Sequence, residues 1–437
     1  MNTQEQQIIE KHIEHSKKGF SSLQEFVIDQ KACAYCGCCV SICPKASIQM
    51  GDESPQLVGD CNNCGICYLA CPRTFLPMTS MQKWMFNTEE IPPLGSFERV
   101  ELAGSTSSEI LDKAPDGGVI TTIFSYLLDN ELFDAVITTG KQHDISWCYH
   151  PKPLVLTDGD GLLECADKKY DPNPLLSVLR DTTQYSKVAF AGLACHVQPV
   201  RKLQYAAQTY REILPAFAKA ADKLTRNIDF VIGIGDIGRF GRGKIDVLLQ
   251  EFGVSGEKEV ARHLEERITA NFVFQLHDGK TVPIPQSAVV KYPQPFCFLC
   301  NDFNGYVSDM SVDRSEYQQF NTILMRNKKA EDIFSQCLDR KLLQTRELPD
   351  EGRDFLKEME PMLQAFTDYD LYGYEHYLKN GEFSIDPSME QMFGNQESRR
   401  LRGLPENMMM ELLKKYPQYG FCTKKRKAMG YVNPDIF

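Results

Sequence analysis

The sequence has no long apolar segment and no apolar leader. No uninterrupted apolar run approaches the ~18 residues of a transmembrane helix, and the stretch DFVIGIG at 229–235 is far too short. The opening segment, MNTQEQQIIEKHIEHSKKGF, is polar and charged, unlike a secretory signal. We therefore expect a soluble, cytoplasmic protein without an integral membrane segment.

The chain also lacks the excess of positive charge that suits nucleic acids and anionic membranes. Its 48 Lys and Arg residues against 59 Asp and Glu residues give a formal net charge of −11. This balance argues against nucleic acid as a main partner. With 437 residues, 42% of them hydrophobic and 24% charged, the chain has the composition of an ordinary globular protein of more than one domain.

Cysteine, in contrast, is abundant, with 16 residues in the chain. In a reducing cytosol, clustered cysteines are metal ligands or redox groups more often than disulfides. Two segments carry most of them, CAYCGCCVSICP at 33–44 and CNNCGICYLACP at 61–72. Each follows the pattern C-x2-C-x2-C-x3-C-P and contains no histidine. The near-identical spacing indicates two sites of one kind.

This spacing is typical of bacterial ferredoxins with two [4Fe–4S] clusters, in which the fourth cysteine of each run ligates the other cluster. A tight loop brings three thiolates to one face of an iron–sulfur cube. The predicted ligand sets are Cys33, Cys36, Cys39 and Cys71 for one cluster, and Cys61, Cys64, Cys67 and Cys43 for the other. Cys38 is left over, and we expect it to be buried. Zinc knuckles are the alternative, but they lack the third regular cysteine and the Cys-Pro pair.

After the proline-rich segment EEIPPLG at 89–95, the pattern becomes that of an α/β domain. Residues 117–140 predict a helix opened by two glycines and then a strand. Residues 186–204 predict a strand and a helix, and residues 227–253 predict a strand, a glycine-rich turn and a helix. Such units indicate a sheet with ligand loops at the carboxyl ends of its strands. From about 311 onward the sequence predicts polar helices.

Two glycine-rich loops of this part could meet a cofactor. Adjacent Gly117 and Gly118 at a helix start let backbone N–H groups approach a phosphate or a flavin edge, although such a pair is also an ordinary turn. In GIGDIGRFGRGK, Gly233, Gly235 and Gly238 match G-x-G-x-x-G, which leaves nicotinamide binding as an alternative.

Three further cysteines suggest a third cluster. Cys195 follows a predicted strand, and Cys297 and Cys300 form a C-x2-C pair. A fourth ligand is missing among the nearby cysteines, so Asp236 or His196 would have to supply it. The alternative is that Cys195 is a small buried residue and that the C-x2-C pair has no redox role.

The order of these motifs resembles the coenzyme F420 hydrogenase/dehydrogenase beta-subunit family. The motifs are the paired cysteine runs, a DGGV loop, a G-x-x-C strand-turn and a C-x2-C-x-DF…D-x-S segment, and they cover about residues 25–315. Members of that family are flavoproteins that bind FAD and carry [4Fe–4S] clusters. The resemblance implies that the flavin contacts Gly117, Gly118 and Val119, that Asp302 and Asn304 lie near its pocket, and that Cys195, Cys297 and Cys300 hold an inner cluster. Asp236 stands where many members have a cysteine.

We expect four parts: a helical lead (1–24), a 2[4Fe–4S] ferredoxin-like domain (25–88), an FAD-binding α/β domain (96–315) and a helical C-terminal extension (316–437). The resemblance covers the second and third parts and does not account for the extension. It further implies an oxidoreductase that couples hydride transfer at FAD to one-electron transfer along the clusters. Coenzyme F420, ferredoxin and hydrogenase or dehydrogenase subunits are the expected partners. The alternatives are an electron-transfer subunit without a substrate site, and a ferredoxin-dependent reductase of a conjugated molecule such as a tetrapyrrole. No residue is singled out as catalytic.

Overall fold

The computed structural model describes residues 3–88, 94–236, 240–265, 272–285, 304–315 and 317–347, together with positions 288, 292, 294, 296, 297 and 302. The predicted ligand Cys300 and the predicted nicotinamide-loop residue Gly238 lie outside the described residues. So does everything after residue 347, which includes most of the predicted C-terminal extension.

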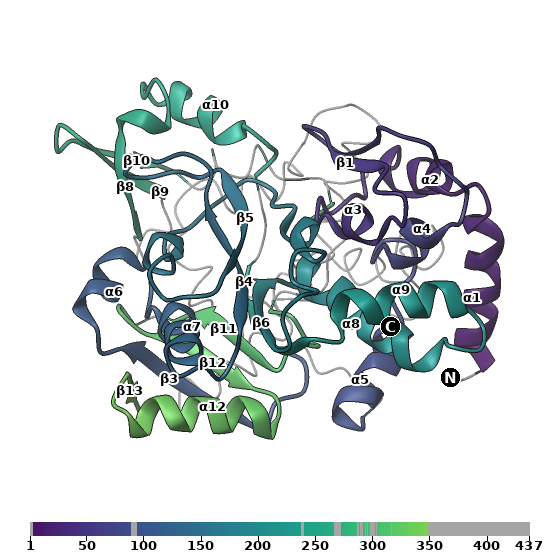
Figure 1. Ribbon diagram of the computed structural model, residues 1–437. Helices are drawn as coiled ribbons and strands as arrows, with labels where there is room; N and C mark the ends of the chain where they lie inside the picture. Colours follow the sequence, from purple (N-terminus) through teal and green to yellow (C-terminus); the bar gives the residue numbers. More distant parts are fainter. Residues whose placement is uncertain are drawn as a thin grey trace, which may run out of the picture.

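An eight-stranded mixed sheet forms the centre of the molecule (Figure 1). Its order is β13-β3-β12-β11-β7-β6-β4-β5. The middle strands β11, β7, β6 and β4 are parallel, and the strands at both sides are antiparallel. The strands are β3 Arg99–Ser105, β4 Ala135–Lys141, β5 Pro151–Leu156, β6 Val188–Leu193, β7 Ile228–Ile234, β11 Met310–Arg314, β12 Asn321–Met325 and β13 Leu343–Arg346.

Helices cover both faces of the sheet, because its central strands are apolar on both sides. In β6, Val188 and Phe190 pack on one face with α8 (Ala194–Thr209) and α9 (Pro215–Thr225). Ala189 and Ala191 pack on the other face with α7 (Val119–Asp129) and α12 (Lys328–Asp339). The short helix α6 (Ser108–Lys113) precedes α7. The elements predicted within 117–140, 186–204 and 227–253 are confirmed.

The prediction of polar helices from about 311 is wrong for the part that the structure describes. Strands β11, β12 and β13 all belong to the main sheet. Among the described residues of this part, the one α-helix is α12, which lies between β12 and β13. The strand β13 reads LQTR and has one buried residue followed by three exposed ones. Such a polar edge strand has no apolar periodicity, which is why its sequence did not predict it.

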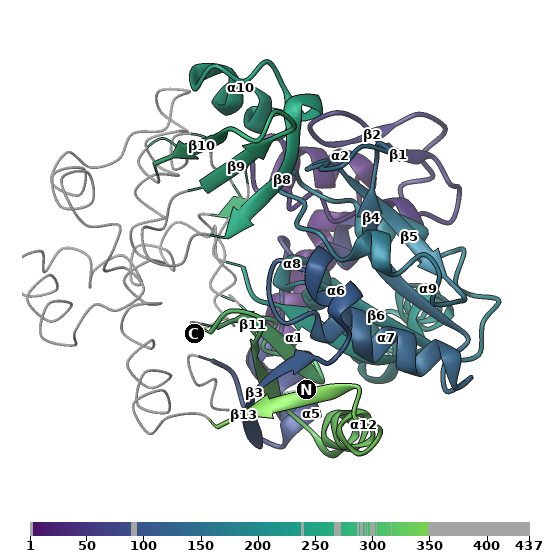
Figure 2. The ribbon, with the colours of Figure 1, turned by 90° about the vertical axis from the view of Figure 1, so that its left-hand side faces the viewer.

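A smaller sheet is inserted between β7 and β11. It consists of β8 Val260–Glu265, β9 Phe272–Leu276 and β10 Thr281–Ile284 in the order β10-β9-β8. The helix α10 (Lys244–Glu251) packs with it in one hydrophobic cluster, and the two lie together at one end of the molecule (Figure 2). A 3-10 helix, Glu257–Glu259, leads into β8.

The N-terminal region carries both cysteine runs and packs beside α8 and α9 (Figure 1). It contains α1 Thr3–Ser16, α2 Phe20–Leu23, a π-helical turn Gln24–Ile28, α3 Cys38–Ile42, the hairpin of β1 Ile48–Met50 and β2 Pro55–Leu57, α4 Ile66–Ala70 and α5 Met78–Phe86. We call residues 33–72 the cysteine module. Two more 3-10 helices, Leu163–Cys165 and Leu175–Val178, connect β5 to β6. Within the described ranges, every helix is too short or too polar to cross a bilayer.

Candidate functional site

The two cysteine runs fold in the same way. In each, a glycine between the second and third cysteines of the motif, Gly37 or Gly65, adopts a left-handed conformation with φ of 83° or 71°. A helix of one turn follows and ends at the fourth cysteine, Cys43 or Cys71, whose backbone is extended. The next residue is proline in both runs, and a residue before proline avoids the helical conformation. The motif therefore determines its own loop, helix and exit.

The first run shares its site with the last cysteine of the second run. Cys33, Cys36 and Cys39 line one small cavity together with Cys71. Burial raises the pKa of the Cys33 thiol to about 12, and the nearby Cys71 thiol adds to this shift. Burial likewise raises the pKa of Cys36 and Cys39, and Cys71 adds to both shifts. Buried thiols crowded in this way suit a metal cation, which holds them as thiolates.

The second run has the reciprocal arrangement. Burial raises the pKa of the Cys67 thiol to about 12, and Cys64, Cys43 and Cys61 add to the shift. Cys43 also packs against the buried cluster that contains Cys67, so the fourth cysteine of the first run lies near the third of the second. Here Cys61 and Cys64 are exposed. The leftover Cys38 is buried, as expected, and it borders the first cavity.

Hydrogen bonds to backbone oxygens join the cysteine module to the segment between β5 and β6, which belongs to the domain built on the main sheet (the sheet domain). Leu176 N donates to Cys36 O at 2.8 Å, and Ser41 Oγ donates to Leu176 O at 2.6 Å. Arg180 Nε donates to Ser41 O at 2.7 Å. A Cβ on Gly37 would lie 2.7 Å from both Pro174 O and Ser177 N, so the two parts touch without space for a side chain.

Sequence reasoning missed a lysine under the cysteine module. Lys202 of α8 is fully buried, and its Nζ donates to Cys71 O at 2.7 Å and to Phe75 O at 2.6 Å. Nζ also lies 3.7 Å from the centre of the Phe75 ring. Burial lowers the pKa of Lys202 to about 7. The helix α8 reads ACHVQPVRKLQYAAQT and mixes polar with apolar residues, so its sequence does not single out Lys202, and only the fold shows what this lysine faces.

The predicted third site lies at the carboxyl edge of the main sheet. Cys195, in the first turn of α8, packs in one buried cluster with Ala34 and Phe296, and Cys297 lies against the same cluster. Ala34 lies between the first two cysteines of the first run, so this corner adjoins the cysteine module. The structure thus brings Cys195 and Cys297 together from distant parts of the chain.

The two candidates for a fourth ligand differ in position. Leu193 at the end of β6 pairs with Ile234 at the end of β7. Cys195 follows Leu193 by two residues and Asp236 follows Ile234 by two residues, so both lie at the same edge of the sheet. His196 is used by the fold instead. Its Nδ1 accepts from Leu193 N at 3.2 Å, and its Nε2 lies 2.9 Å from Asn173 O. Both of its ring nitrogens are occupied, so His196 is not a suitable ligand.

The glycine pair opens α7 as predicted, but the fold itself requires both glycines. A Cβ on Gly117 would lie 2.7 Å from Ala103 O and from Asn321 Oδ1. Gly118 has φ of 66°, and a Cβ there would lie 2.5 Å from Ile110 Cγ2. Val119 is buried. Beside this helix, the side chains of Ile110, Thr122 and Tyr126 help to line a groove of about 450 Å³.

Asp302 and Asn304 belong to a buried polar network in the segment that precedes β11. Asp302 Oδ1 accepts from Gly305 N at 2.7 Å and from Tyr306 N at 3.0 Å. Asn304 Oδ1 accepts from Nη2 of the fully buried Arg326 at 3.1 Å. These bonds hold the segment that leads into β11. They give both predicted flavin-pocket residues a structural role at this position.

Family comparison agrees with this architecture. Residues 101–180 match the family described as coenzyme F420 hydrogenase/dehydrogenase, beta subunit N-term, and residues 185–351 match the corresponding C terminus. The chain belongs to the coenzyme F420 hydrogenase/dehydrogenase beta-subunit family. The resemblance predicted from the motifs is therefore confirmed. The second match runs through β13, which agrees with a sheet that extends beyond residue 315.

Two similar proteins come from Methanocaldococcus jannaschii and Methanosarcina barkeri. The chain is 28% identical over 318 residues to the coenzyme F420-dependent sulfite reductase of Methanocaldococcus jannaschii, covering 70% of this chain and 46% of that protein. It is 25% identical over 276 residues to the coenzyme F420 hydrogenase subunit beta of Methanosarcina barkeri, covering 62% of this chain and 89% of the subunit. The chain thus spans about half of the first relative and most of the second.

A solved structure shares the fold. A chain of the F420-reducing [NiFe] hydrogenase complex from Methanosarcina barkeri superposes with a TM-score of 0.56 at 23% identity, over 68% of this chain and 99% of that one. The likeness supports the mixed α/β architecture.

Proposed function

We propose that this protein is a flavin- and iron–sulfur-dependent oxidoreductase that exchanges electrons with coenzyme F420. The exchange of fourth cysteines between the two runs carries the proposal. Cys71 lies with the first run and Cys43 with the second, which is the ligand arrangement of a two-cluster ferredoxin. Membership of the F420 hydrogenase/dehydrogenase family and the names of its relatives support F420 as the hydride carrier.

The proposed electron path runs from the exposed cluster through the buried one to the carboxyl edge of the sheet. Cys61 and Cys64 would face a partner protein, while Cys33, Cys36, Cys39 and Cys71 would hold the inner cluster of the module. Cys195, Cys297 and Cys300, completed by Asp236, would hold a third cluster next to it. The contact of Ala34 with the Cys195 corner supports this order.

FAD would bind at the same edge, near Gly117, Gly118 and Val119. Ligands of open α/β sheets bind at the carboxyl ends of the strands. A bound FAD would supply two-electron hydride chemistry, and the clusters held by the cysteines would supply one-electron transfer. The contribution of this chain is to hold these groups in one rigid order. The relatives named as hydrogenase and formate dehydrogenase subunits support a complex with partner subunits.

The test is to purify the protein anaerobically and to measure iron, acid-labile sulfide and flavin per chain. Reduced F420 is then supplied with a viologen as electron acceptor, and NADPH serves as the comparison donor. We expect about twelve iron atoms and one FAD per chain, with F420-dependent viologen reduction. Full iron content with no flavin and no reaction with F420 would favour the electron-transfer subunit instead.

A further inference from the structure

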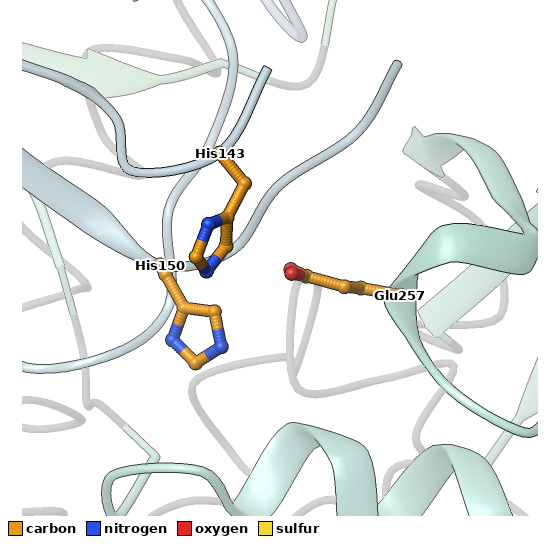
Figure 3. A group of neighbouring side chains, drawn as sticks. All are labelled: His143, His150 and Glu257. Carbon is orange, nitrogen blue, oxygen red and sulfur yellow. The ribbon is translucent and has the colours of Figure 1, made fainter. Parts of the chain in front are cut away.

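A group of three metal-ligating side chains lies outside the sites described so far. His143 and His150 come from the two ends of the loop between β4 and β5, and Glu257 opens the 3-10 helix before β8 (Figure 3). Their donor atoms all lie within 4.8 Å of one another. The two imidazole rings are perpendicular, with centroids 5.5 Å apart.

The burial of the Glu257 carboxylate independently indicates a ligand at this position. The residue is only 9% exposed, and its Oε2 is buried without a hydrogen-bond partner in the part of the chain that the structure describes. An unpaired buried carboxylate oxygen is costly, because it has lost its water without gaining a donor. In Figure 3 this carboxylate points toward the two histidines. A cation between them would satisfy it.

His150 is already oriented as a metal ligand. Its Nδ1 lies 2.9 Å from Oδ2 of Asp171, which leaves Nε2 free on the other side of the ring. Asp171 is itself buried and accepts from Gly243 N at 3.2 Å. A carboxylate that holds the far nitrogen of a histidine is the usual support of a metal-bound imidazole, because it fixes the ring and the tautomer.

The backbone that carries these groups is well fixed. Gln142 N donates to His150 O at 3.0 Å and closes the loop. Trp147 and Tyr149 within the loop are fully buried, and the Trp147 ring lies 5.1 Å from that of Phe274 in the small sheet. The loop therefore presents its histidines from a packed base.

We propose that His143, His150 and Glu257 bind one divalent first-row transition-metal ion, of which zinc is the probe. Two imidazoles and one carboxylate suit such an ion, and three protein ligands leave a fourth position for water or an anionic ligand. Tetrahedral bonds of about 2.0–2.1 Å place donor atoms roughly 3.3 Å apart. The donors thus have to converge by about 1.5 Å at most. The ion would join the β4–β5 loop to the small sheet.

Zinc titration of the anaerobic, full-length holoprotein tests this site. Calorimetry should show one equivalent of bound zinc, while the iron content and the cluster absorption stay constant. Glu257→Gln keeps the size of the side chain but removes its charge and should weaken binding at least about tenfold, and Asp171→Asn should weaken it about 10–100-fold. Glu259→Gln, two residues along the same 3-10 helix and exposed, is the matched control and should bind like wild type.

The exposed His143 provides a variant in which folding is not at stake. His143→Ala should weaken zinc binding as Glu257→Gln does, and His277→Ala, at an exposed histidine of the small sheet, should not. A wild-type protein that binds no zinc would overturn the proposal. Equal zinc binding by wild type, His143→Ala and Glu257→Gln would overturn it as well.

Discussion

The two cysteine runs have one spacing but lie in different surroundings. In the first run Cys36 and Cys39 are buried, and its backbone is bonded to Leu176 of the sheet domain. In the second run Cys61 and Cys64 are exposed. The same local motif therefore produces an inner site and an outer site. Position in the fold, and not the motif, decides which of them can meet a partner.

This difference has a consequence for the proposed clusters. Solvent exposure and nearby charges set the potential of an iron–sulfur cluster as much as its ligands do. In the inner site Cys36 and Cys39 are buried and Lys202 donates to the backbone oxygen of Cys71, whereas Cys61 and Cys64 of the outer site are exposed. We therefore expect two distinct potentials from two nearly identical motifs.

Substitutions of the cysteines that the two runs are proposed to exchange should have the largest effect, a loss of iron. Cys36→Ser should remove the inner cluster, about four iron atoms per chain. Adding Cys71→Ser should remove little more, because both residues belong to one site, whereas adding Cys43→Ser should remove the outer cluster too. Iron analysis and the EPR spectrum of the reduced protein measure these losses.

The control for this double-variant series is Cys38→Ala. Cys38 is buried beside the same cavity but is not a predicted ligand, so its iron content should equal that of wild type. If Cys36→Ser with Cys71→Ser lost both clusters, and Cys36→Ser with Cys43→Ser lost one, each run would hold its own cluster.

The proposed third cluster lies outside the cysteine module, at the carboxyl edge of the main sheet. Cys195→Ser should lower the iron content from about twelve to about eight atoms per chain and leave the EPR signals of the module unchanged. Cys337→Ser, at a buried cysteine of α12 on the other face of the sheet, should keep all the iron. An iron content near eight in the wild type would show that the Cys195 corner holds no cluster.

Lys202 allows the inner and outer potentials to be separated without loss of iron. A cation stabilises the more negative, reduced state, so Lys202→Met should lower the potential of the inner cluster more than that of the outer one.

Potentiometric EPR titrations of wild type and Lys202→Met check that prediction. The exposed Lys17, directly after α1, provides the control, since Lys17→Met removes the same charge from a side chain that lies in solvent. Equal shifts of both potentials in Lys202→Met would mean that the lysine does not act on the inner site.

The smallest expected effect concerns the helix α1, which rests on the module. Burial, followed by the charge of Lys202, lowers the pKa of His12 to about 3, and its Nδ1 lies 2.9 Å from the Tyr68 hydroxyl. The unfolded chain binds a proton at its ordinary value near 6.5 and the folded chain does not. Stability from this residue is therefore present above about 6.5 and falls as pH drops toward 3.

Replacing His12 by Phe should reduce this acid sensitivity, because the ring still stacks on Phe75, whose centre lies 5.0 Å from that of His12. We expect the drop in Tm between about pH 7 and about pH 5 to be a few degrees smaller than in wild type. The same drop in His12→Phe and wild type would contradict this prediction, and His277→Phe is the exposed control.

Local patterns predicted the parts of the structure that local physics decides. The tight loop and the Cys-Pro exit of each cysteine run are encoded within a dozen residues, and so are the strand and helix around Cys195. The polar strand β13 escaped prediction because its partner β3 lies more than 200 residues away. His196 looked like a free ligand until the fold placed Asn173 beside its ring.

The close contact at Gly37 between the cysteine module and the sheet domain has a consequence for the kinetics of electron transfer. Since the backbone of Pro174 and Ser177 occupies the space where a side chain would begin, the module and the sheet domain are packed directly against each other there. This packing would fix the spacing between the proposed inner cluster and the Cys195 corner when the chain folds. Electron passage between them should be insensitive to solvent viscosity, in contrast to the encounter with a partner at the exposed run.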